Sequence, residues 1–401
     1  MSPTLKLALA TGVALATLTG AASSADVKFG FLGGVTGPIE SLTPPIIDGA
    51  KLALQNVNDQ GGLMDGKTIE LVVGDTTCTD ATKASDAADR EVNVDNVSAI
   101  VGALCSGATI SAANNAGIPG GVAMISPAST SPALTTLDDK NLVFRTVVSD
   151  AFQGGVLANV VKNAGKDNVA VTYVNNDYGK GFAEAFVAAF KAAGGNVTAS
   201  QAHEDGKADY RSEIGALSST GADALVILAY GDGSGQTILR QAIEGGDFSE
   251  FFGGDGMISQ ALADNVPAAE GKIIMTRPST PDLPGSDAFF ALADAGKINA
   301  NGTYVANSYD AAFILALAAE KAGSTDRAAI AGAISDVANP PGEVILPGEW
   351  NKAKELIAAG KDINYEGAAG SQDFDENGDV KGVYVTTVIE DGKIKNTGEA
   401  Q

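Results

Sequence analysis

Short apolar runs alternate with amphipathic stretches along most of this 401-residue chain. Short apolar runs bounded by glycine are typical of strands buried on both faces of a parallel sheet. The stretches between them repeat apolar positions at helical spacing, as residues 44–58 do through Ile46, Ala50, Leu54 and Val57. The alternation predicts βαβ units and an α/β fold.

Two successive sets of such units are expected. The first set comprises strands at 27–32, 69–74, 99–103, 122–126 and 143–146, with helices at 44–58 and from near Asp80 and Ser106. The second set comprises helices at 152–164, 179–193, 210–219 and 236–245, and strands at 169–174, 196–202, 224–229 and 272–276. Further helices are expected at 287–295, 305–321, 326–335 and 350–359, with a loop at 339–342 and a strand at 382–389. This order predicts two lobes, with a return of the chain to the first lobe before its end.

The first residues have the pattern of a secretory leader. Lys6 precedes an apolar run at 7–18, and the small residues Ser23, Ser24 and Ala25 form a cleavage site. The run is shorter than the roughly 20 apolar residues that span a membrane. We therefore predict a signal peptide at residues 1–25 and a soluble, exported mature chain, and with no cysteine at the cleavage point we expect no lipid anchor.

Cys78 and Cys105 are the two cysteines of the chain. In an oxidising compartment, a pair that closes a loop is expected to form a disulfide and to stabilise the fold by about 3 kcal/mol. Two free buried thiols are the alternative.

Charge and length limit the function classes. The chain carries 49 acidic and 26 basic residues, a formal net charge of -23. Phosphate binding needs clustered Lys and Arg, so we expect no nucleic-acid partner. The length exceeds one ordinary core and favours two domains of roughly 150 to 200 residues each.

Residue patterns for catalysis are missing. His203 is the only histidine, and its polar surroundings at 203–206 favour a solvated loop residue over a catalytic or metal-binding one. The sequence has no Gly-x-Ser-x-Gly elbow and no Walker loop. The run at 373–379 imitates the start of a calcium loop, but Tyr384 replaces the twelfth-position Glu, so we expect a turn between strands. We predict no enzyme activity, metal or cofactor.

Three loops carry groups suited to binding, and each follows a predicted strand, where open parallel sheets bind ligands. Ser106 places a hydroxyl and backbone N–H groups at a helix start, which favours a carboxylate; an N-cap is the alternative. The loop at 126–132 offers hydroxyls and amides held by prolines, with a capped turn as the alternative. Asp255, flanked by glycines, would pair with an ammonium, with a type I turn or cap as the alternative.

Several motifs occur in the order in which one known family has them. They are Thr-Gly-Pro at 36–38, Asn-Asp-Gln-Gly-Gly at 58–62, Asp-Thr-Thr-Cys at 75–78, Leu-Cys-Ser at 104–106, Ser-Pro-Ala-Ser-Thr at 126–130, Asp-Tyr-Gly-Lys-Gly at 177–181, Ile-Leu-Arg-Gln-Ala at 238–242 and Ser-Tyr-Asp-Ala at 308–311. Across nearly the whole mature chain the sequence resembles the periplasmic leucine/isoleucine/valine-binding proteins of ABC importers, which have the type I periplasmic binding protein fold.

The resemblance implies two lobes, each a doubly wound, mainly parallel sheet flanked by helices, joined by three hinge crossings. The implied divisions are lobe 1 at 26–147, lobe 2 at 148–276, lobe 1 again at 277–371, and the C-terminal strands and tail of lobe 2 at 372–401.

The resemblance also implies site residues. Ser106 and Thr130, with backbone groups of Ala128 and Ser129, match positions that hold the α-carboxylate and help hold the α-ammonium of an amino acid. Asp255 matches the acidic partner of the ammonium. Tyr178 matches a pocket tyrosine from the second lobe, Tyr304 matches an aromatic position beside the ligand side chain, and Tyr230 lies within one residue of another family tyrosine. Buried core residues are the alternative for all three.

From the resemblance we expect a periplasmic, monomeric binding protein that captures leucine, isoleucine or valine by hinge closure and delivers it to an ABC permease. The rivals are the same fold with another amino acid, an amide or an aromatic acid, a ligand-sensing receptor domain, and an exported hydrolase. Two departures from the family stand out. The loop at 39–42 lacks a tyrosine that some relatives have, and residues 340–370 form a longer segment without an assigned role.

Overall fold

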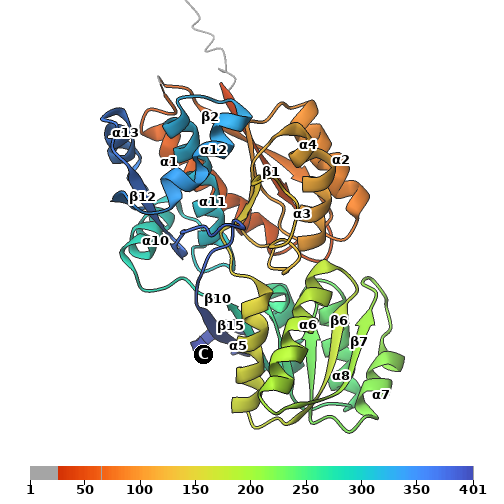
Figure 1. Cartoon of the computed structure of the whole chain (residues 1–401). Coiled ribbons are helices and arrows are strands. Elements are labelled where there is room, and N and C mark those ends of the chain that lie inside the picture. Colours follow the sequence, from red (N-terminus) through yellow and green to blue (C-terminus); the bar gives the residue numbers. More distant parts are fainter. Residues whose placement is uncertain (1–25, 65, 401) are drawn as a thin grey trace, which may run out of the picture.

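The computed structural model describes residues 26–64 and 66–400 and consists of two lobes, each a sheet with helices on its faces (Figure 1). The leader predicted at 1–25 lies outside the described residues. The predicted α/β class with mainly parallel sheets is confirmed. Within the described part of the chain, no helix is long and apolar enough to cross a membrane.

Lobe 1 is built on a five-stranded parallel sheet in the order β2-β1-β3-β4-β5. Its strands are β1 (Val27–Gly33), β2 (Ile69–Asp75), β3 (Ala99–Gly102), β4 (Met124–Ser126) and β5 (Val143–Arg145). Its helices are α1 (Thr43–Asp59), α2 (Ala81–Asn93), α3 (Ser106–Ala112), α4 (Ile118–Gly120), α10 (Pro284–Gly296), α11 (Val305–Ala322) and α12 (Arg327–Ala338). Every residue of α11 from Val305 to Ala319 is buried, which agrees with the unbroken apolar run at 311–319.

Lobe 2 is built on a seven-stranded mixed sheet in the order β15-β14-β10-β9-β8-β6-β7. Its strands are β6 (Asn168–Val174), β7 (Asn196–His203), β8 (Ala224–Leu228), β9 (Phe251–Gly253), β10 (Ile273–Pro278), β14 (Tyr384–Glu390) and β15 (Lys393–Ala400). Its helices are α5 (Asp150–Asn163), α6 (Asp177–Ala192), α7 (Arg211–Ser218), α8 (Ser234–Gly245) and α9 (Gln260–Asn265). The strands β14 and β15 pair antiparallel beside β10, so the last strands of the chain complete the sheet of lobe 2.

The long segment at 340–370 folds onto lobe 1 (Figure 1). It contains β11 (Glu343–Ile345), α13 (Trp350–Ala358) and β12 (Ile363–Gly367), and with β13 (Gly370–Ser371) it forms a three-stranded sheet. Trp350 is fully buried edge-on against Phe313 of α11, with ring centroids 6.0 Å apart. The carboxylate of Asp310 on α11 accepts hydrogen bonds from the Tyr365 hydroxyl and from the backbone of Ala368. The segment therefore extends the core of lobe 1.

The chain passes between the two sheets after β5, after β10 and after β13 (Figure 1). In the last crossing, the acidic run forms a turn, because the Asp375 carboxylate accepts hydrogen bonds from the backbone of Asn377 and Asp379. The prediction of a turn between strands is confirmed. Each crossing therefore lies beside the space between the lobes.

Candidate functional site

A narrow cleft between the lobes brings most of the predicted site residues together. It is lined by Ile39, Ile46, Leu104, Cys105, Ser106, Ala128 and Tyr304 from lobe 1, and by Tyr178, Tyr230, Asp255 and Gly256 from lobe 2. Its free volume is about 30 Å³, enough for one or two water molecules. Ser129 and Thr130, which carry hydroxyls, are buried but do not line it.

Lobe 1 contributes its side of the cleft from the carboxyl ends of β3 and β4. Ser106 is the first residue of α3, whose N-cap position is taken by Cys105. The alternative that Ser106 serves as an N-cap is therefore wrong; its Oγ instead accepts a hydrogen bond from the backbone of Ser131, at 3.2 Å. The Ser129 hydroxyl pairs with that of Thr109 at 2.6 Å. These bonds tie the two loops of lobe 1 together.

A buried ion pair supports the loop at 126–132. Arg145 of β5 is 1% exposed, and its guanidinium donates to both carboxylate oxygens of Asp379, at 2.6 and 2.7 Å. The same guanidinium donates to the carbonyl oxygens of Ser129 and Ser131. The turn of the last crossing thus fixes the backbone of a cleft loop. Neither Arg145 nor Asp379 stood out in the sequence as a site residue.

Asp255 from lobe 2 is the charged group of the cleft. It is fully buried, and one carboxylate oxygen accepts hydrogen bonds from the Tyr178 hydroxyl, at 2.8 Å, and from the backbone of Gly256, at 2.9 Å. The other oxygen accepts from the Tyr304 hydroxyl of lobe 1. A Cβ at Gly256 would lie 2.8 Å from the Tyr178 hydroxyl, so glycine is required for this approach. The carboxylate therefore joins the lobes.

A second buried acid, Asp150, lies at the first crossing. Burial raises the pKa of Asp150 well above its ordinary value, and the charge of Asp255 raises it further. Burial also raises the pKa of Asp255, while hydrogen bonds from Tyr304 and Tyr178 lower it. No sequence pattern indicated Asp150 as a site residue, because an Asp after Ser149 at a helix start has the pattern of an ordinary capped turn.

The three predicted tyrosines line the cleft. Tyr178 and Tyr230 stack with ring centroids 5.2 Å apart, and the Tyr230 hydroxyl accepts from the Asn176 side chain. Tyr304 has φ of +67°, a left-handed conformation that is uncommon for residues other than glycine. This backbone directs its ring from the start of α11 toward Asp255.

Apolar side chains that no sequence pattern indicated as site residues complete the cleft. Ile39 lies in the loop before α1, Ile46 lies in the first turn of α1, and Leu104 follows β3. The predicted disulfide between Cys78 and Cys105 is present, with Cα atoms 5.3 Å apart, and places Cys105 beside Leu104 in the wall. The apolar wall could have been found only by knowing which loops meet.

Direct contacts between the lobes flank the cleft. The Asp232 carboxylate of lobe 2 accepts from the backbone of Ser41 in lobe 1, at 2.8 Å, and from the Ser259 hydroxyl, at 3.0 Å. The Ser131 hydroxyl donates to the carbonyl oxygen of Asp177 at the start of α6. We refer to the Ser41–Asp232–Ser259 contacts as the Asp232 latch.

His203 does not belong to the site, and the prediction of a solvated loop residue is wrong. It is the last residue of β7 and is 3% exposed, since the start of α8 covers it. Its ring nitrogens pair with the hydroxyls of Thr172 and Ser234, and burial lowers its pKa to about 4. Among the described residues, no cluster of three or more His, Cys, Asp or Glu side chains could hold a metal ion.

A family of known proteins and several of its members match the chain over most of its length. Residues 48–387 match the model of the family described as "Receptor family ligand binding region". The chain is 30% identical over 325 residues, 80% of this chain and 86% of the relative, to a leucine-, isoleucine-, valine-, threonine- and alanine-binding protein of Pseudomonas aeruginosa. It is 28% identical over 353 residues, 88% of this chain and 93% of the relative, to the Leu/Ile/Val-binding protein of Escherichia coli.

A solved structure shows the same fold. The leucine-binding protein of Thermotoga maritima matches with a TM-score of 0.78 and 26% identity, over 94% of this chain and 99% of its own. These relatives are solute-binding proteins rather than enzymes. The chain therefore has the type I periplasmic binding protein fold and belongs to the receptor ligand-binding family together with the Leu/Ile/Val-binding proteins.

Proposed function

We propose that this protein is exported to the periplasm, captures an amino acid between its lobes as a monomer, and delivers it to an ABC permease. Leucine, isoleucine and valine are the favoured solutes, because the relatives that match the chain over most of its length are named for binding them. We propose that the protein acts by binding alone and that no covalent bond of the solute is made or broken.

The buried carboxylate of Asp255 is the observation that carries the proposal. A buried charge is costly unless it is paired, and an ammonium group is a natural partner for it. Its present partners are the neutral hydroxyls of Tyr178 and Tyr304 and a backbone amide. An α-ammonium placed beside Asp255 would add the missing opposite charge.

The opposite rim would hold the α-carboxylate. We assign the Ser106 and Thr130 hydroxyls and the backbone of Ala128 and Ser129 to this role. Ser106 and Ala128 lie in the wall of the cleft, while Thr130 is buried and two residues along the chain from Ala128. The two poles of an amino acid would then be held by different lobes, which makes binding depend on closure.

The apolar wall fits an aliphatic side chain. Ile39, Ile46 and Leu104 form it, and no charged side chain other than Asp255 lines the cleft. The free volume is smaller than such a side chain needs, so entry requires the lobes to separate first. We propose that they rotate about the three crossings, with the lobe divisions predicted above except that the third crossing extends from Ser371 to Tyr384 and its residues up to Asp379 stay with lobe 1.

Calorimetry with the mature protein tests the proposal. L-leucine, L-isoleucine and L-valine are expected to bind, whereas isovalerate, which lacks the ammonium, and isoamylamine, which lacks the carboxylate, are expected to bind far more weakly. D-leucine is a control for the geometry of the two poles. No heat with any of the three L-amino acids would refute the proposed solute class, and equal affinity for isoamylamine would refute the two-pole mechanism.

A further inference from the structure

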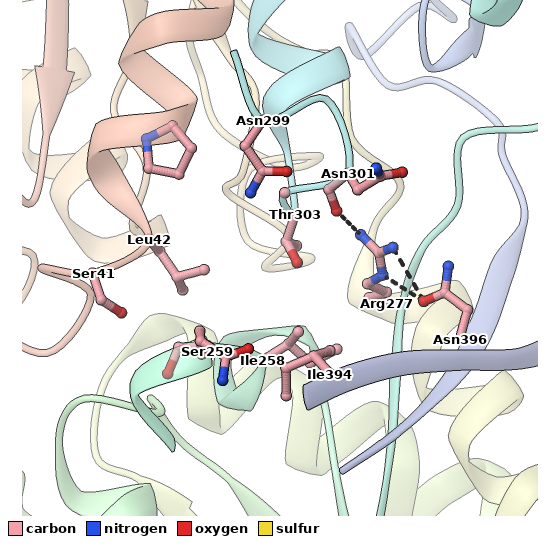
Figure 2. A pocket seen from close by; sticks show the side chains of 13 residues that line it. Ser41, Leu42, Ile258, Ser259, Arg277, Asn299, Asn301, Thr303, Ile394 and Asn396 are labelled. Atoms are coloured by element: carbon pink, nitrogen blue, oxygen red, sulfur yellow. Dashed lines mark hydrogen bonds between the residues drawn. The ribbon is translucent and has the colours of Figure 1, made fainter. Parts of the chain in front are cut away.

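A second and much larger cavity lies between the lobes. Its volume is about 510 Å³, within the range of ligand pockets, whereas the cleft at Asp255 has about 30 Å³. Figure 2 shows Asn299 and Thr303 of lobe 1 above this cavity, and Ile258, Ser259 and Ile394 of lobe 2 below it. We call it the Arg277 chamber, after the one charged side chain that lines it.

The lining of the chamber has an unusual charge for this protein. Acidic residues outnumber basic ones by 49 to 26 in the chain, yet no Asp or Glu lines the chamber. Asp232 and Asp264 bond to lining residues but do not line the cavity themselves. The other polar groups of the wall are hydroxyls and side-chain amides. The chamber therefore offers one positive charge surrounded by neutral hydrogen-bonding groups.

Arg277 is held in place without a carboxylate partner. It lies near the end of β10, and among the described residues it forms no salt bridge. Its Nε and one terminal nitrogen donate to Asn396 Oδ1, at 3.2 and 3.1 Å, and the other terminal nitrogen lies 3.4 Å from the carbonyl oxygen of Asn301 (Figure 2). Neutral acceptors orient the guanidinium and leave its charge uncompensated.

The chamber adjoins the Asp255 cleft. The same chain segments supply both walls, since Ile39 and Ile46 line the cleft while Leu42 and Pro45 line the chamber. Thr303 faces the chamber, and the next residue, Tyr304, faces the cleft and bonds Asp255. Tyr304 therefore stands at the boundary between an acidic and a basic compartment.

We propose that the Arg277 chamber binds a carboxylate group and that this group favours the closed arrangement, because both lobes wall the chamber. A carboxylate matches the fork of the guanidinium and accepts hydrogen bonds from the neighbouring hydroxyls and amides. Two sources share this chemistry. The carboxylate belongs either to a free small organic acid or to the side chain of an acidic amino acid seated at Asp255; the second source rests on the proposed function.

Calorimetry with three probes separates the two sources. Succinate tests a free acid, L-glutamate tests a solute that reaches both compartments, and L-leucine tests the cleft alone. Each probe is titrated into the mature wild-type protein and into Arg277→Gln, Arg277→Lys and Arg90→Gln. Arg90 is a matched control, since its side chain is 74% exposed on α2 and lies outside the chamber lining. Thermal unfolding checks that the Arg277 variants fold; the backbone of Arg277 keeps its pairing with Val385.

A free acid as the source predicts that succinate binds the wild type and Arg90→Gln, and that Arg277→Gln weakens it roughly tenfold or more. A side-chain source predicts the same loss for L-glutamate while L-leucine is unaffected. Arg277→Lys should fall between, because it keeps the charge but loses the fork. If neither succinate nor L-glutamate distinguishes Arg277→Gln from the wild type, the chamber proposal is overturned. Failure of L-leucine to bind the wild type would instead overturn the proposed function and leave the succinate result to decide the chamber.

Discussion

The two cavities between the lobes share walls but differ in charge and size. The small cleft contains the buried carboxylate of Asp255, whereas the large chamber contains the guanidinium of Arg277 and no acid. Both are formed when the lobes meet, so closure creates an acidic and a basic compartment together. The difference teaches that affinity for the charged end of a solute and selectivity for the rest of it can be set by separate residues.

Removing the acid should give the largest effect. Asp255→Ala is expected to weaken amino-acid binding by about 2 to 5 kcal/mol, roughly 30- to 5,000-fold, because the ammonium loses a buried partner. Calorimetry with L-leucine measures this loss, and Asp294→Ala, an exposed acid in lobe 1, is the control. Unchanged affinity in Asp255→Ala would show that Asp255 does not pair with the ammonium, and the cleft would then not differ from the chamber in the charge that it binds.

Lowering the pH should weaken the binding of a solute in the cleft but not the binding of a carboxylate in the chamber. Burial raises the pKa of Asp255, so this carboxyl takes up a proton at a higher pH than an exposed carboxyl does. An ammonium favours the ionised Asp255, and binding must then release that proton. Affinity for L-leucine is therefore expected to fall as the pH drops, by at most about tenfold per pH unit for one proton.

Calorimetry in two buffers of different ionisation heat counts the released protons. Over the range in which succinate stays fully ionised, its binding should show no such release, since no carboxyl lines the chamber. Proton release with succinate, or none with L-leucine at acidic pH, would contradict the division into an acidic and a basic compartment.

Breaking the Asp232 latch should give the smallest effect and should not distinguish the compartments. Asp232→Ala removes the acceptor for the backbone of Ser41 and for the Ser259 hydroxyl, and each such bond contributes about 0.5 to 1.5 kcal/mol. Only the Ser41 bond crosses between the lobes, so we expect every solute to lose affinity by the same factor, roughly two- to twelvefold. A change in the ratio of leucine to valine affinity would show that Asp232 contributes to selectivity instead.

Local sequence signals predicted much of the fold. Glycine-bounded apolar runs located the central strands, and the rule that parallel sheets bind ligands at their carboxyl ends selected the loops at Ser106, Ala128 and Asp255. The structure places all three in one cleft. This rule can be applied to a sequence because the pattern that identifies a strand is local, and the loop that follows the strand then lies at its carboxyl end.

Other residues depend on contacts that no local pattern records. Arg145 is recognisable as a support only through Asp379, which lies 234 residues further along the chain. His203 is buried because the start of α8 packs over it, so its polar neighbours in sequence were misleading. Asp150 and Arg277 matter because the crossings carry them to the space between the lobes. Such roles require the tertiary arrangement.

The ion pair between Arg145 and Asp379 has a mechanical consequence. Arg145 belongs to the sheet of lobe 1, and Asp379 is bound to it through both carboxylate oxygens. In the proposed rotation, residues up to Asp379 would turn with lobe 1, while β14 from Tyr384 onward would turn with lobe 2. The third crossing would then bend within the four residues 380–383, so a substitution that stiffens this segment should slow opening without touching any solute.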